Sequence, residues 1–454
     1  MNVHFIAIGG SAMHNLAIAL KKKGILVTGS DDEIFEPAKS RLRKYDLLPI
    51  DEGWFPERIT GELDAIILGM HARVDNPELL KAQELGIKVY SYPEFLYEQA
   101  RGKRRVVIGG SHGKTTITAM ILHVLQSVGK ECDYMVGAQL EGFEVMVKLT
   151  ASAPVMVFEG DEYLTSPIDR RPKFHLYMPD IALVSGIAWD HMNVFPTFDN
   201  YIEQFRIFAR LVSKNGKLIY CKEDKVVTDA VKSADNSVEL IGYSLPENTL
   251  EKGVTYLITP HGKFALKVFG HHNLLNLSGA LEVCRQLGVA DQDFYKAISS
   301  FKGASNRLES IGKNEHTMIF RDFAHSPSKL KATSSAVKEQ YPDRKLVACM
   351  ELHTYSSLSQ AFLEQYAGAM NAADLPIVFF NPHALAIKKL PPITPEQVKI
   401  AFGRPDILVF TDSDQLFDLL QSMDWKNKNL LMMSSGDFGG KDVKELANQL
   451  LISG

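Results

Sequence analysis

The stretch RVVIGGSHGKTTITAMILHVLQSVG, residues 105–129, decides the fold of the central part of this chain. Val106, Val107 and Ile108 form a short apolar run, which predicts a buried strand. After the glycines, apolar residues recur at three- and four-residue steps, which predicts a helix with one core-facing stripe that ends at Gly129. The stripe consists of Ile117, Met120, Ile121, Val124, Leu125 and Val128.

The glycine turn between this strand and this helix is typical of a phosphate-binding loop. Glycines let the backbone N–H groups point at phosphate oxygens, and the helix N-terminus adds the positive end of its dipole. Lys114 would then reach the β/γ-phosphates of a nucleoside triphosphate, and Thr115 would ligate Mg²⁺. Only Ser111 and His112 separate Gly110 from Gly113, so the loop is shorter than the usual motif, and a glycine turn with a chance lysine is the alternative.

Length and composition indicate a multidomain α/β enzyme. The chain has 454 residues, which predicts about three domains of about 150 residues each. Its net charge of −4 and the lack of a long basic run predict no nucleic-acid partner and no anionic membrane surface. The four cysteines are far apart, so we expect neither a zinc site nor disulfides, and without a leader or a membrane span we expect a cytoplasmic protein. Nothing in the sequence indicates an oligomeric state.

The first domain is predicted to cover residues 1–100 and to be Rossmann-like. It begins with a strand, a glycine turn at Gly9 and Gly10, a helix, and a second strand that ends near Asp31. Asp31 lies about twenty residues beyond the glycines, where a dinucleotide-binding fold would hold a ribose hydroxyl. Because Ala12 and Met13 interrupt the glycine signature, NAD binding, and with it an NAD-dependent oxidoreductase, is only an alternative here.

The second domain is predicted to cover residues 101–303, with polar clusters at the ends of apolar runs. Glu159 follows one such run, and a carboxylate beside a phosphate loop suits Mg²⁺. Asp190 and His191 follow another, although a structural turn is an equally good interpretation. Asn273 and Asn276 are three residues apart at the start of a predicted helix and therefore share a face. For Asn273 the alternative is simple N-capping.

The third domain is predicted to cover residues 304–454. Strands alternate with helices along this part of the chain, and the alternation predicts a second parallel sheet.

In combination and order, the motifs of the chain resemble those of the Mur ligase family, ATP-dependent amide-forming enzymes of peptidoglycan metabolism. The resemblance covers essentially the whole chain and implies a Rossmann-like UDP-binding domain, a central P-loop ATPase-like domain and a Rossmann-like C-terminal domain. The motifs that carry it are GSHGKTT at 110–116, EGDEY at 159–163, WDH at 189–191, HNLLN at 272–276, NRLE at 306–309, DFAHSP at 322–327 and SSGDFGG at 434–440.

The resemblance also implies roles for individual residues. Lys114, Glu159 and His191 would be catalytic, and Thr115, Glu159 and His191 would position Mg²⁺. ATP would be bound by Gly110, Ser111, His112, Gly113, Lys114, Thr115, Thr116, Asn273, Asn276, Arg307, Asp322 and His325. The sugar nucleotide would be bound by Gly9, Gly10, Ser11, Ala12, Met13, Asp31 and His71.

Two features indicate different amino donors. The first domain resembles those of family members that take UDP-N-acetylmuramate. Residues 142–145 and 169–179 resemble members that attach a preformed tripeptide, L-Ala-γ-D-Glu-meso-diaminopimelate, and Arg170, Arg171 and Lys173 would bind its carboxylates. Residues 353–356, beginning with His353, resemble instead the members that attach free L-alanine. We expect the tripeptide, because its match spans the longer run, and keep L-alanine as the alternative.

The family's reaction explains why such residues are needed. A free carboxylate is a poor electrophile, so the γ-phosphoryl of ATP is transferred to the lactoyl carboxylate, and an amine then attacks the acyl phosphate. Lys114, Mg²⁺ and the loop amides would offset the repulsion between the two anions. The amine must lose a proton, and His191 or a carboxylate not identified here could accept it.

Overall fold

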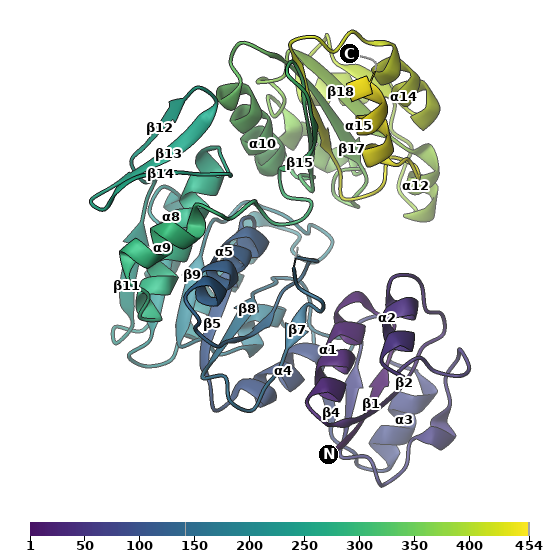
Figure 1. Ribbon diagram of the computed structural model, residues 1–454. Helices are drawn as coiled ribbons and strands as arrows, with labels where there is room; N and C mark the ends of the chain where they lie inside the picture. Colours follow the sequence, from purple (N-terminus) through teal and green to yellow (C-terminus); the bar gives the residue numbers. More distant parts are fainter. Residues whose placement is uncertain (141, 453–454) are drawn as a thin grey trace. The chain divides into compact units, whose positions relative to one another are not determined.

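The computed structural model, drawn in Figure 1, describes residues 1–140 and 142–452. By its internal contacts, the chain divides into two compact units. The first unit comprises Met1–Ile187, Asp199–Tyr243 and Gly279–Asp291. The second comprises Ala188–Phe198, Ser244–Ser278 and Gln292–Gly454. Both units contain mainly parallel sheets with helices, which confirms the expected α/β class.

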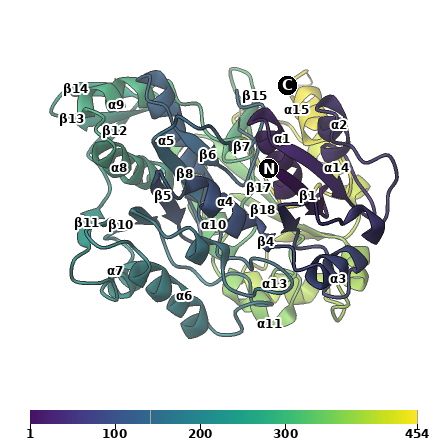
Figure 2. The ribbon, with the colours of Figure 1, turned by 90° about the horizontal axis from the view of Figure 1, so that it is seen from below.

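The first unit begins with a parallel sheet of four strands in the order β2-β1-β3-β4. The predicted glycine turn joins β1 to α1, and α1 and α2 lie next to each other (Figures 1 and 2). Local sequence sets the helix starts: Asn76 caps α3, and Ser91 forms a capping box with Glu94 at α4. The elements are β1 (Asn2–Ile6), α1 (Ser11–Lys22), β2 (Leu26–Ser30), α2 (Ala38–Lys44), η1 (Pro56–Arg58), β3 (Ala65–Leu68), α3 (Pro77–Glu84), β4 (Val89–Ser91) and α4 (Tyr92–Ala100).

A second sheet of the first unit has seven strands in the order β11-β10-β9-β5-β8-β6-β7, of which only β7 is antiparallel to its neighbour. Strand β5 lies between β9 and β8, so the loop after β5 and the end of β8 meet at one edge of the sheet. The strands are β5 (Arg104–Gly109), β6 (Asp133–Met135), β7 (Val147–Lys148), β8 (Val155–Glu159), β9 (Ile181–Val184), β10 (Lys217–Cys221) and β11 (Glu239–Tyr243). The helices around it are α5 (Lys114–Ser127), η2 (Lys173–Leu176), α6 (Phe198–Arg210), α7 (Lys225–Val231) and α8 (His271–Gln286).

Helix α5 corrects one expectation from the sequence. Its apolar residues predicted a single core-facing stripe, yet Thr115, Thr116 and Thr118 are buried together with that stripe. A helix enclosed on most sides is apolar or internally satisfied almost all round. The helix that carries the phosphate loop is therefore fixed inside the unit.

The second unit is built on a sheet of six strands in the order β15-β16-β20-β17-β18-β19. Alternate residues of β17 enter different cores: Ala348 and Met350 pack on one face, and Val347 and Cys349 pack on the other. The strands are β15 (Glu309–Lys313), β16 (Met318–Asp322), β17 (Lys345–Leu352), β18 (Leu375–Phe380), β19 (Leu408–Phe410) and β20 (Lys428–Met433). The helices are α9 (Asp291–Ile298), α10 (Pro327–Gln340), α11 (Gln360–Leu363), η3 (Glu364–Tyr366), α12 (Pro382–Ile387), α13 (Pro395–Phe402), α14 (Ser413–Ser422) and α15 (Val443–Ile452).

The expectation of a parallel sheet in this part of the chain is confirmed for the five predicted strands, β16 to β20, which all pair in parallel. Strand β15 pairs antiparallel with β16, because the two strands are consecutive and joined by a short turn. A separate antiparallel sheet of three strands was not foreseen at all; it consists of β12 (Asn248–Glu251), β13 (Val254–Thr259) and β14 (Gly262–Ala265).

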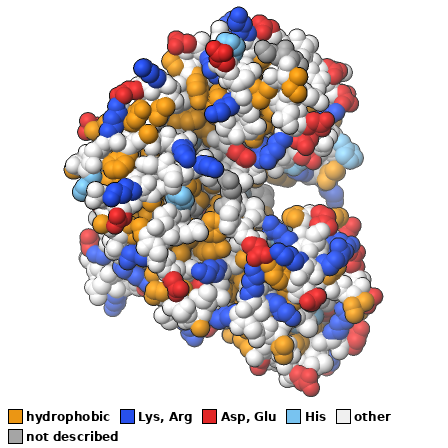
Figure 3. Space-filling model, viewed as in Figure 1, with side chains coloured by type: hydrophobic (Ala, Val, Ile, Leu, Met, Phe, Trp, Pro, Cys, Tyr) orange, Lys and Arg blue, Asp and Glu red, His pale blue; other side chains and the backbone are white. Residues whose placement is uncertain are grey.

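The surface of the protein is mixed in charge. On the face seen in Figure 3, basic and acidic side chains are interspersed. Among the described helices, none combines the length and the apolar character that crossing a bilayer requires.

Candidate active site

The predicted phosphate loop has the backbone of a phosphate cradle. Gly110 and Gly113 have φ angles of +135° and +80°, which favour glycine, and Gly113 is the N-cap of α5. A Cβ on Gly110 would lie 2.1 Å from the hydroxyl of Ser185. The loop therefore requires a glycine at this position, and its role in phosphate binding stays a prediction.

Lys114 has a buried counter-ion inside this loop. Its ammonium donates to the carbonyl of Gly110 and to a carboxylate oxygen of Glu162, each at 2.6 Å. Burial lowers the pKa of Lys114, but the carboxylates of Glu162 and Asp161 outweigh burial and raise it above its usual value. Lys114 is therefore a fixed positive charge at the start of α5.

Tyr201 holds that counter-ion in place and was missed by the sequence analysis. Its hydroxyl lies 3.0 Å from the second oxygen of Glu162 and 3.1 Å from the hydroxyl of Ser111. Tyr201 belongs to the buried face of α6, so in the sequence it is indistinguishable from an ordinary core aromatic.

Thr115, in the first turn of α5, contacts Glu159 at the end of β8, and the two side chains suit Mg²⁺. The Thr115 hydroxyl donates to Glu159 Oε1 at 2.6 Å, and the N–H of Gly137 donates to Oε2 at 2.9 Å. A hydroxyl and a carboxylate are oxygen ligands of the type that this hard cation prefers. Thr115 and Glu159 therefore fit an Mg²⁺ ion that accompanies ATP.

His191, the third predicted metal ligand, belongs to the second unit. It has a φ angle of +56°, and its N–H donates to the side chain of Asp190 at 2.8 Å. Neither unit thus holds all the predicted ligands, and no group of three or more His, Cys, Asp or Glu side chains suited to a metal occurs among the described residues. The ligand set Thr115, Glu159 and His191 stays a prediction.

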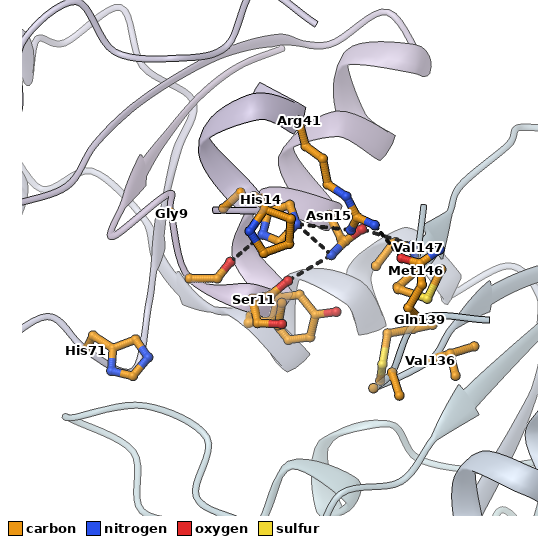
Figure 4. Close-up of a pocket in the computed structure, with 18 of the residues that line it drawn as sticks. Gly9, Ser11, His14, Asn15, Arg41, His71, Val136, Gln139, Met146 and Val147 are labelled. Carbon is orange, nitrogen blue, oxygen red and sulfur yellow. Dashed lines mark hydrogen bonds between the residues drawn. The ribbon is translucent and has the colours of Figure 1, made fainter. Parts of the chain in front are cut away.

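A cavity of 890 Å³ in the first unit is lined both by the turn at Gly9 and Gly10 and by Lys114, which follows the predicted phosphate loop. Figure 4 shows part of its lining, around Gly9 and His14. One end is lined by the residues predicted to bind the sugar nucleotide, namely Gly9, Gly10, Ser11, Ala12, Asp31 and His71. Met13 is instead buried in α1, where it packs under Gly10. The other end is lined by Lys114, Glu159, Asp161 and Lys173. One cavity therefore joins the predicted sugar-nucleotide turn to the phosphate loop.

Asp31 shapes the first end of this cavity. One of its carboxylate oxygens accepts the N–H of Gly9 at 2.7 Å, so this N–H already has an acceptor. Burial, with a smaller contribution from the neighbouring Asp32, raises the pKa of Asp31 to about 6, although the bond from Gly9 opposes the shift. The prediction that this turn binds a diphosphate therefore depends on the other N–H groups at the start of α1.

Four further polar side chains line the cavity and form hydrogen bonds there: His14, Asn15, Arg41 and Gln139. Arg41 on α2 donates to Gln139, which comes from the segment after β6, and lies 3.4 Å from the imidazole of His14 (Figure 4). The side chain of Asn15 accepts the N–H of Met146 at 3.0 Å. Sequence reasoning missed these residues, because each pair is far apart along the chain and belongs to no motif.

The side chain of Glu144 accepts three hydrogen bonds from residues at the ends of α1 and α2. It accepts hydrogen bonds from Lys22 at 2.7 Å, from Lys44 at 2.6 Å and from the hydroxyl of Tyr45. These bonds lower the pKa of Glu144 to about 2. Residues 142–145, which were expected to indicate the amino donor, thus connect α1 and α2 to the segment between β6 and β7.

Asn273 and Asn276 lie in the first part of α8, which belongs to the second unit, whereas the helix from Gly279 onward belongs to the first; both asparagine side chains are buried. The side-chain amide of Asn273 donates to the carbonyl of Phe269 at 2.9 Å. An N-cap would instead accept a backbone N–H, so the N-capping interpretation was wrong. Their predicted contact with ATP is untested.

Arg307, Asp322 and His325 are gathered at the end of β16 in the second unit. The guanidinium of Arg307 lies 4.6 Å from the ring centre of Phe323. Asp322 accepts the hydroxyl of Thr333 at 2.6 Å, and burial raises its pKa. His325 contacts the carbonyl of Phe323 at 2.9 Å.

The segment 188–198 packs against these residues. Asp190 lies 3.3 Å from the ammonium of Lys329 and 3.8 Å from the imidazole of His325. Burial raises the pKa of Asp190, but the charges of Lys329, His325 and His191 bring it well below its usual value. Asp190 is therefore an ion-pair partner within the second unit, which agrees with its structural interpretation.

The candidates for amino-donor binding are divided between the units. In the first unit, Arg171 pairs with Asp169 at 2.6 Å and Lys173 pairs with Asp161 at 2.6 Å. Arg170 is exposed, and its side chain makes no hydrogen bond or ion pair within the described part of the chain. In the second unit, His353 lies 3.6 Å from the buried carboxylate of Glu351.

Comparisons with known proteins cover nearly the whole chain. Residues 2–104 match the "Mur ligase family, catalytic domain", residues 108–284 the "Mur ligase middle domain", and residues 306–436 the "Mur ligase, glutamate ligase domain". The UDP-N-acetylmuramate–L-alanine ligase of Arthrobacter sp. (strain FB24) is 31% identical over 390 residues, which cover 83% of this chain and 80% of that protein. The corresponding ligase of Persephonella marina is 28% identical and covers 99% and 96%.

Solved structures show the same fold. The UDP-N-acetylmuramate–alanine ligase of Thermotoga maritima has a TM-score of 0.71 at 20% identity and covers 100% of this chain and 99% of that one. A murein peptide ligase of Psychrobacter arcticus has a TM-score of 0.65 at 21% identity and covers 100% and 98%. These matches confirm the three-domain α/β architecture. The chain belongs to the Mur ligase family, whose members are ATP-dependent, ADP-forming amide ligases.

Proposed function

We propose that this protein joins an amine to the lactoyl carboxylate of UDP-N-acetylmuramate at the expense of ATP, in the cytoplasm. The observation that carries the proposal is the single cavity with a sugar-nucleotide turn at one end and Lys114 and Glu159 at the other. Such a cavity can place the carboxylate of a bound sugar nucleotide beside the phosphate loop. An NAD-dependent oxidoreductase would not need that loop, and the family matches support the ligase instead.

The residues of the first unit fit the proposed reaction. Lys114 and the loop amides would bind the phosphates and offset the repulsion between the γ-phosphoryl group and the carboxylate. Thr115 and Glu159 would hold Mg²⁺, which would neutralise further charge on the phosphates. Transfer of the phosphoryl group gives an acyl phosphate, and attack by the amine then releases phosphate. His191 is the candidate to accept the proton of the amine.

L-alanine is the amino donor that the comparisons support better. The relatives reported above are named as L-alanine ligases, and Arg171 and Lys173, expected to bind a tripeptide, already have carboxylate partners. The tripeptide L-Ala-γ-D-Glu-meso-diaminopimelate remains the second candidate. It is favoured by the run of residues 169–179 and by the exposed side chain of Arg170, which makes no ion pair with any residue that the structure describes.

Phosphate release in the presence of UDP-N-acetylmuramate, ATP and Mg²⁺ tests the proposal. We expect release only when an amine is added, and a higher kcat/KM for L-alanine than for the tripeptide. A higher kcat/KM for the tripeptide would establish the second candidate, because a site built for several carboxylates discriminates strongly against a donor that leaves its cations unpaired. Phosphate release that does not depend on the sugar nucleotide would contradict the proposal as a whole.

A further inference from the structure

Arg41 lines the cavity and plays no part in the reaction as described so far. It is half-buried and belongs to the end of the cavity that Gly9 and Gly10 line. Figure 4 shows its side chain reaching from α2 toward His14 and Gln139, with dashed lines marking its contacts there. The guanidinium of Arg41 is therefore part of the cavity wall near the predicted sugar-nucleotide turn.

Arg41 differs from the other cations of the cavity in having no carboxylate partner. Three Lys or Arg side chains line the cavity, namely Arg41, Lys114 and Lys173. Lys114 pairs with Glu162 at 2.6 Å, and Lys173 has its own carboxylate partner at the same distance. Arg41 forms no ion pair within the part of the chain that the structure describes. Its charge is thus available to an anionic ligand, and hydrogen bonds between a guanidinium and an anion are about twice as strong as those between neutral groups.

His14 holds Arg41 in place without neutralising it. The imidazole Nδ1 lies 2.9 Å from the carbonyl oxygen of Gly10, which can only accept, so Nδ1 carries the proton. The other nitrogen, Nε2, is then an acceptor and lies 3.1 Å from the side-chain amide of Asn15 and 3.4 Å from the guanidinium of Arg41. Burial lowers the pKa of His14 and the charge of Arg41 adds to this effect, although the bond to Gly10 opposes it. A neutral imidazole therefore connects Arg41 to the turn at Gly10.

A diphosphate at this end of the cavity needs more positive charge than the turn supplies. Each phosphate of a diphosphate is negative, whereas the N-terminus of a helix offers only about half an elementary charge. The segment after β2 adds carboxylates to the lining of the same end, namely Asp31, Asp32, Glu33 and Glu36. One of them, Asp31, already accepts the N–H of Gly9. Arg41 is the cation at this end that can offset the negative charge of a diphosphate.

The contacts of Arg41 indicate which part of a sugar nucleotide it meets. The carboxylate of the sugar must approach Lys114 at the other end of the cavity, whereas Arg41 is connected through His14 to the turn. We propose that the guanidinium of Arg41 binds the diphosphate of the sugar nucleotide beside the first N–H groups of α1, and that His14 and Gln139 position it. This inference rests on the proposed function and names a residue that binds its nucleotide substrate.

Titration calorimetry with Arg41→Gln tests the inference without relying on turnover. The substitution removes the charge and keeps an amide that can donate hydrogen bonds. We expect UDP-N-acetylmuramate and UDP to bind the variant about tenfold more weakly than the wild type, and by the same factor, because both ligands carry the diphosphate. The affinity for uridine, which has no phosphate and is measured by competition with UDP, should not change.

Arg43→Gln is the matched control. Arg43 is an exposed arginine on the same helix, two residues further along, and does not line the cavity. We expect this control to bind all three ligands as the wild type does. We also expect Arg41→Gln to unfold at the same temperature as the wild type, because Arg41 forms no ion pair with the described residues of the free protein.

The possible results distinguish this inference from the proposed function. If the wild type binds UDP-N-acetylmuramate and Arg41→Gln binds it as tightly, the inference is wrong and the proposed function stands. Weaker binding of UDP-N-acetylmuramate alone would mean that Arg41 contacts the sugar or its carboxylate, and equal weakening of all three ligands would mean that the substitution disturbs the whole site. Either result overturns the inference. A wild type that binds neither UDP-N-acetylmuramate nor UDP would contradict both proposals.

Discussion

Lys114 and Glu162 act as one buried pair, so a test of Lys114 must account for both charges. Removing only the lysine leaves a buried carboxylate without its ion-pair partner, which typically costs 3–5 kcal/mol of stability. Glu162 is 1% exposed, and the hydroxyl of Tyr201 still bonds to it in that case. The double variant Lys114→Met, Glu162→Gln removes both charges and is the better test of chemistry.

We predict that Lys114→Ala and the double variant each lower kcat by about 100-fold or more, because both lose the charge that offsets phosphoryl and carboxylate repulsion. The affinity for UDP-N-acetylmuramate, measured by calorimetry, should change little in the double variant. Lys214→Ala, an exposed lysine, serves as the control and should turn over normally. A double variant with more than about a tenth of the wild-type rate would contradict the assignment of Lys114.

Asp31 gives a second prediction, which concerns stability and pH. Because its pKa is raised from 3.8 to about 6, the folded protein binds the proton more tightly than the unfolded chain. Ionised Asp31 therefore destabilises the fold, and the contribution of Asp31 to stability falls as the pH rises from about 4 to 6. Asp31→Asn cannot ionise and can still accept the N–H of Gly9.

Urea unfolding of the wild type and of Asp31→Asn between pH 4 and 7 measures this contribution. We expect the wild type to lose stability relative to the variant up to about pH 6 and the difference to stay constant above it. Parallel stability profiles across this range would show that Asp31 titrates normally.

At the scale of elements, a substitution of Glu144 tests whether its contacts with α1 and α2 support binding of the sugar nucleotide. We predict that Glu144→Gln raises the KM for the sugar nucleotide about threefold and leaves kcat unchanged, because it weakens contacts made at the surface and none at the phosphate loop. The effect should shrink at high salt, since the ion pairs are exposed. Steady-state kinetics at low and high ionic strength provide the measurement.

Glu203→Gln is the matched control for this variant. Glu203 is a similarly exposed glutamate that pairs with Arg206 and Arg210 on α6 and does not line the cavity. An equal change of KM in both variants would mean that the contacts of Glu144 with Lys22, Lys44 and Tyr45 have no specific effect on binding of the sugar nucleotide.

The elements that could be predicted are those whose signals are local. The strand, loop and helix of residues 105–129 follow from apolar spacing and glycines, and the turn at Gly9 and Gly10 follows in the same way. The bonds from Arg41 to Gln139 and from Asn15 to Met146 join residues about a hundred positions apart, and no local pattern encodes them. The antiparallel strand β15 was not predicted at all, because its alternation of apolar and polar residues is weak.

At the scale of the molecule, the boundaries of the matched family domains differ from the boundaries of the two compact units. His191 lies within the residues that match the middle domain, yet it packs in the second unit with Asp190 and Lys329. Its neighbour Trp189 contacts Phe362 of the same unit, with the ring centres 6.5 Å apart. The predicted metal ligands are therefore divided between the units, whereas Lys114, Thr115 and Glu159 are assembled within the first unit alone.

The choice of amino donor also belongs to this scale, because the two candidate sites lie in different units. If L-alanine is the donor, we predict that His353→Ala lowers kcat/KM for L-alanine about tenfold and that Arg170→Ala leaves it unchanged. The reason is that one small amino acid needs few contacts, and Arg170 lies on an exposed loop of the first unit. Arg43→Ala, another exposed arginine, is the control for a general loss of positive charge. If Arg170→Ala instead lowers kcat/KM for the tripeptide and Arg43→Ala does not, the cation on this loop binds a donor carboxylate, and the tripeptide replaces L-alanine as the proposed substrate.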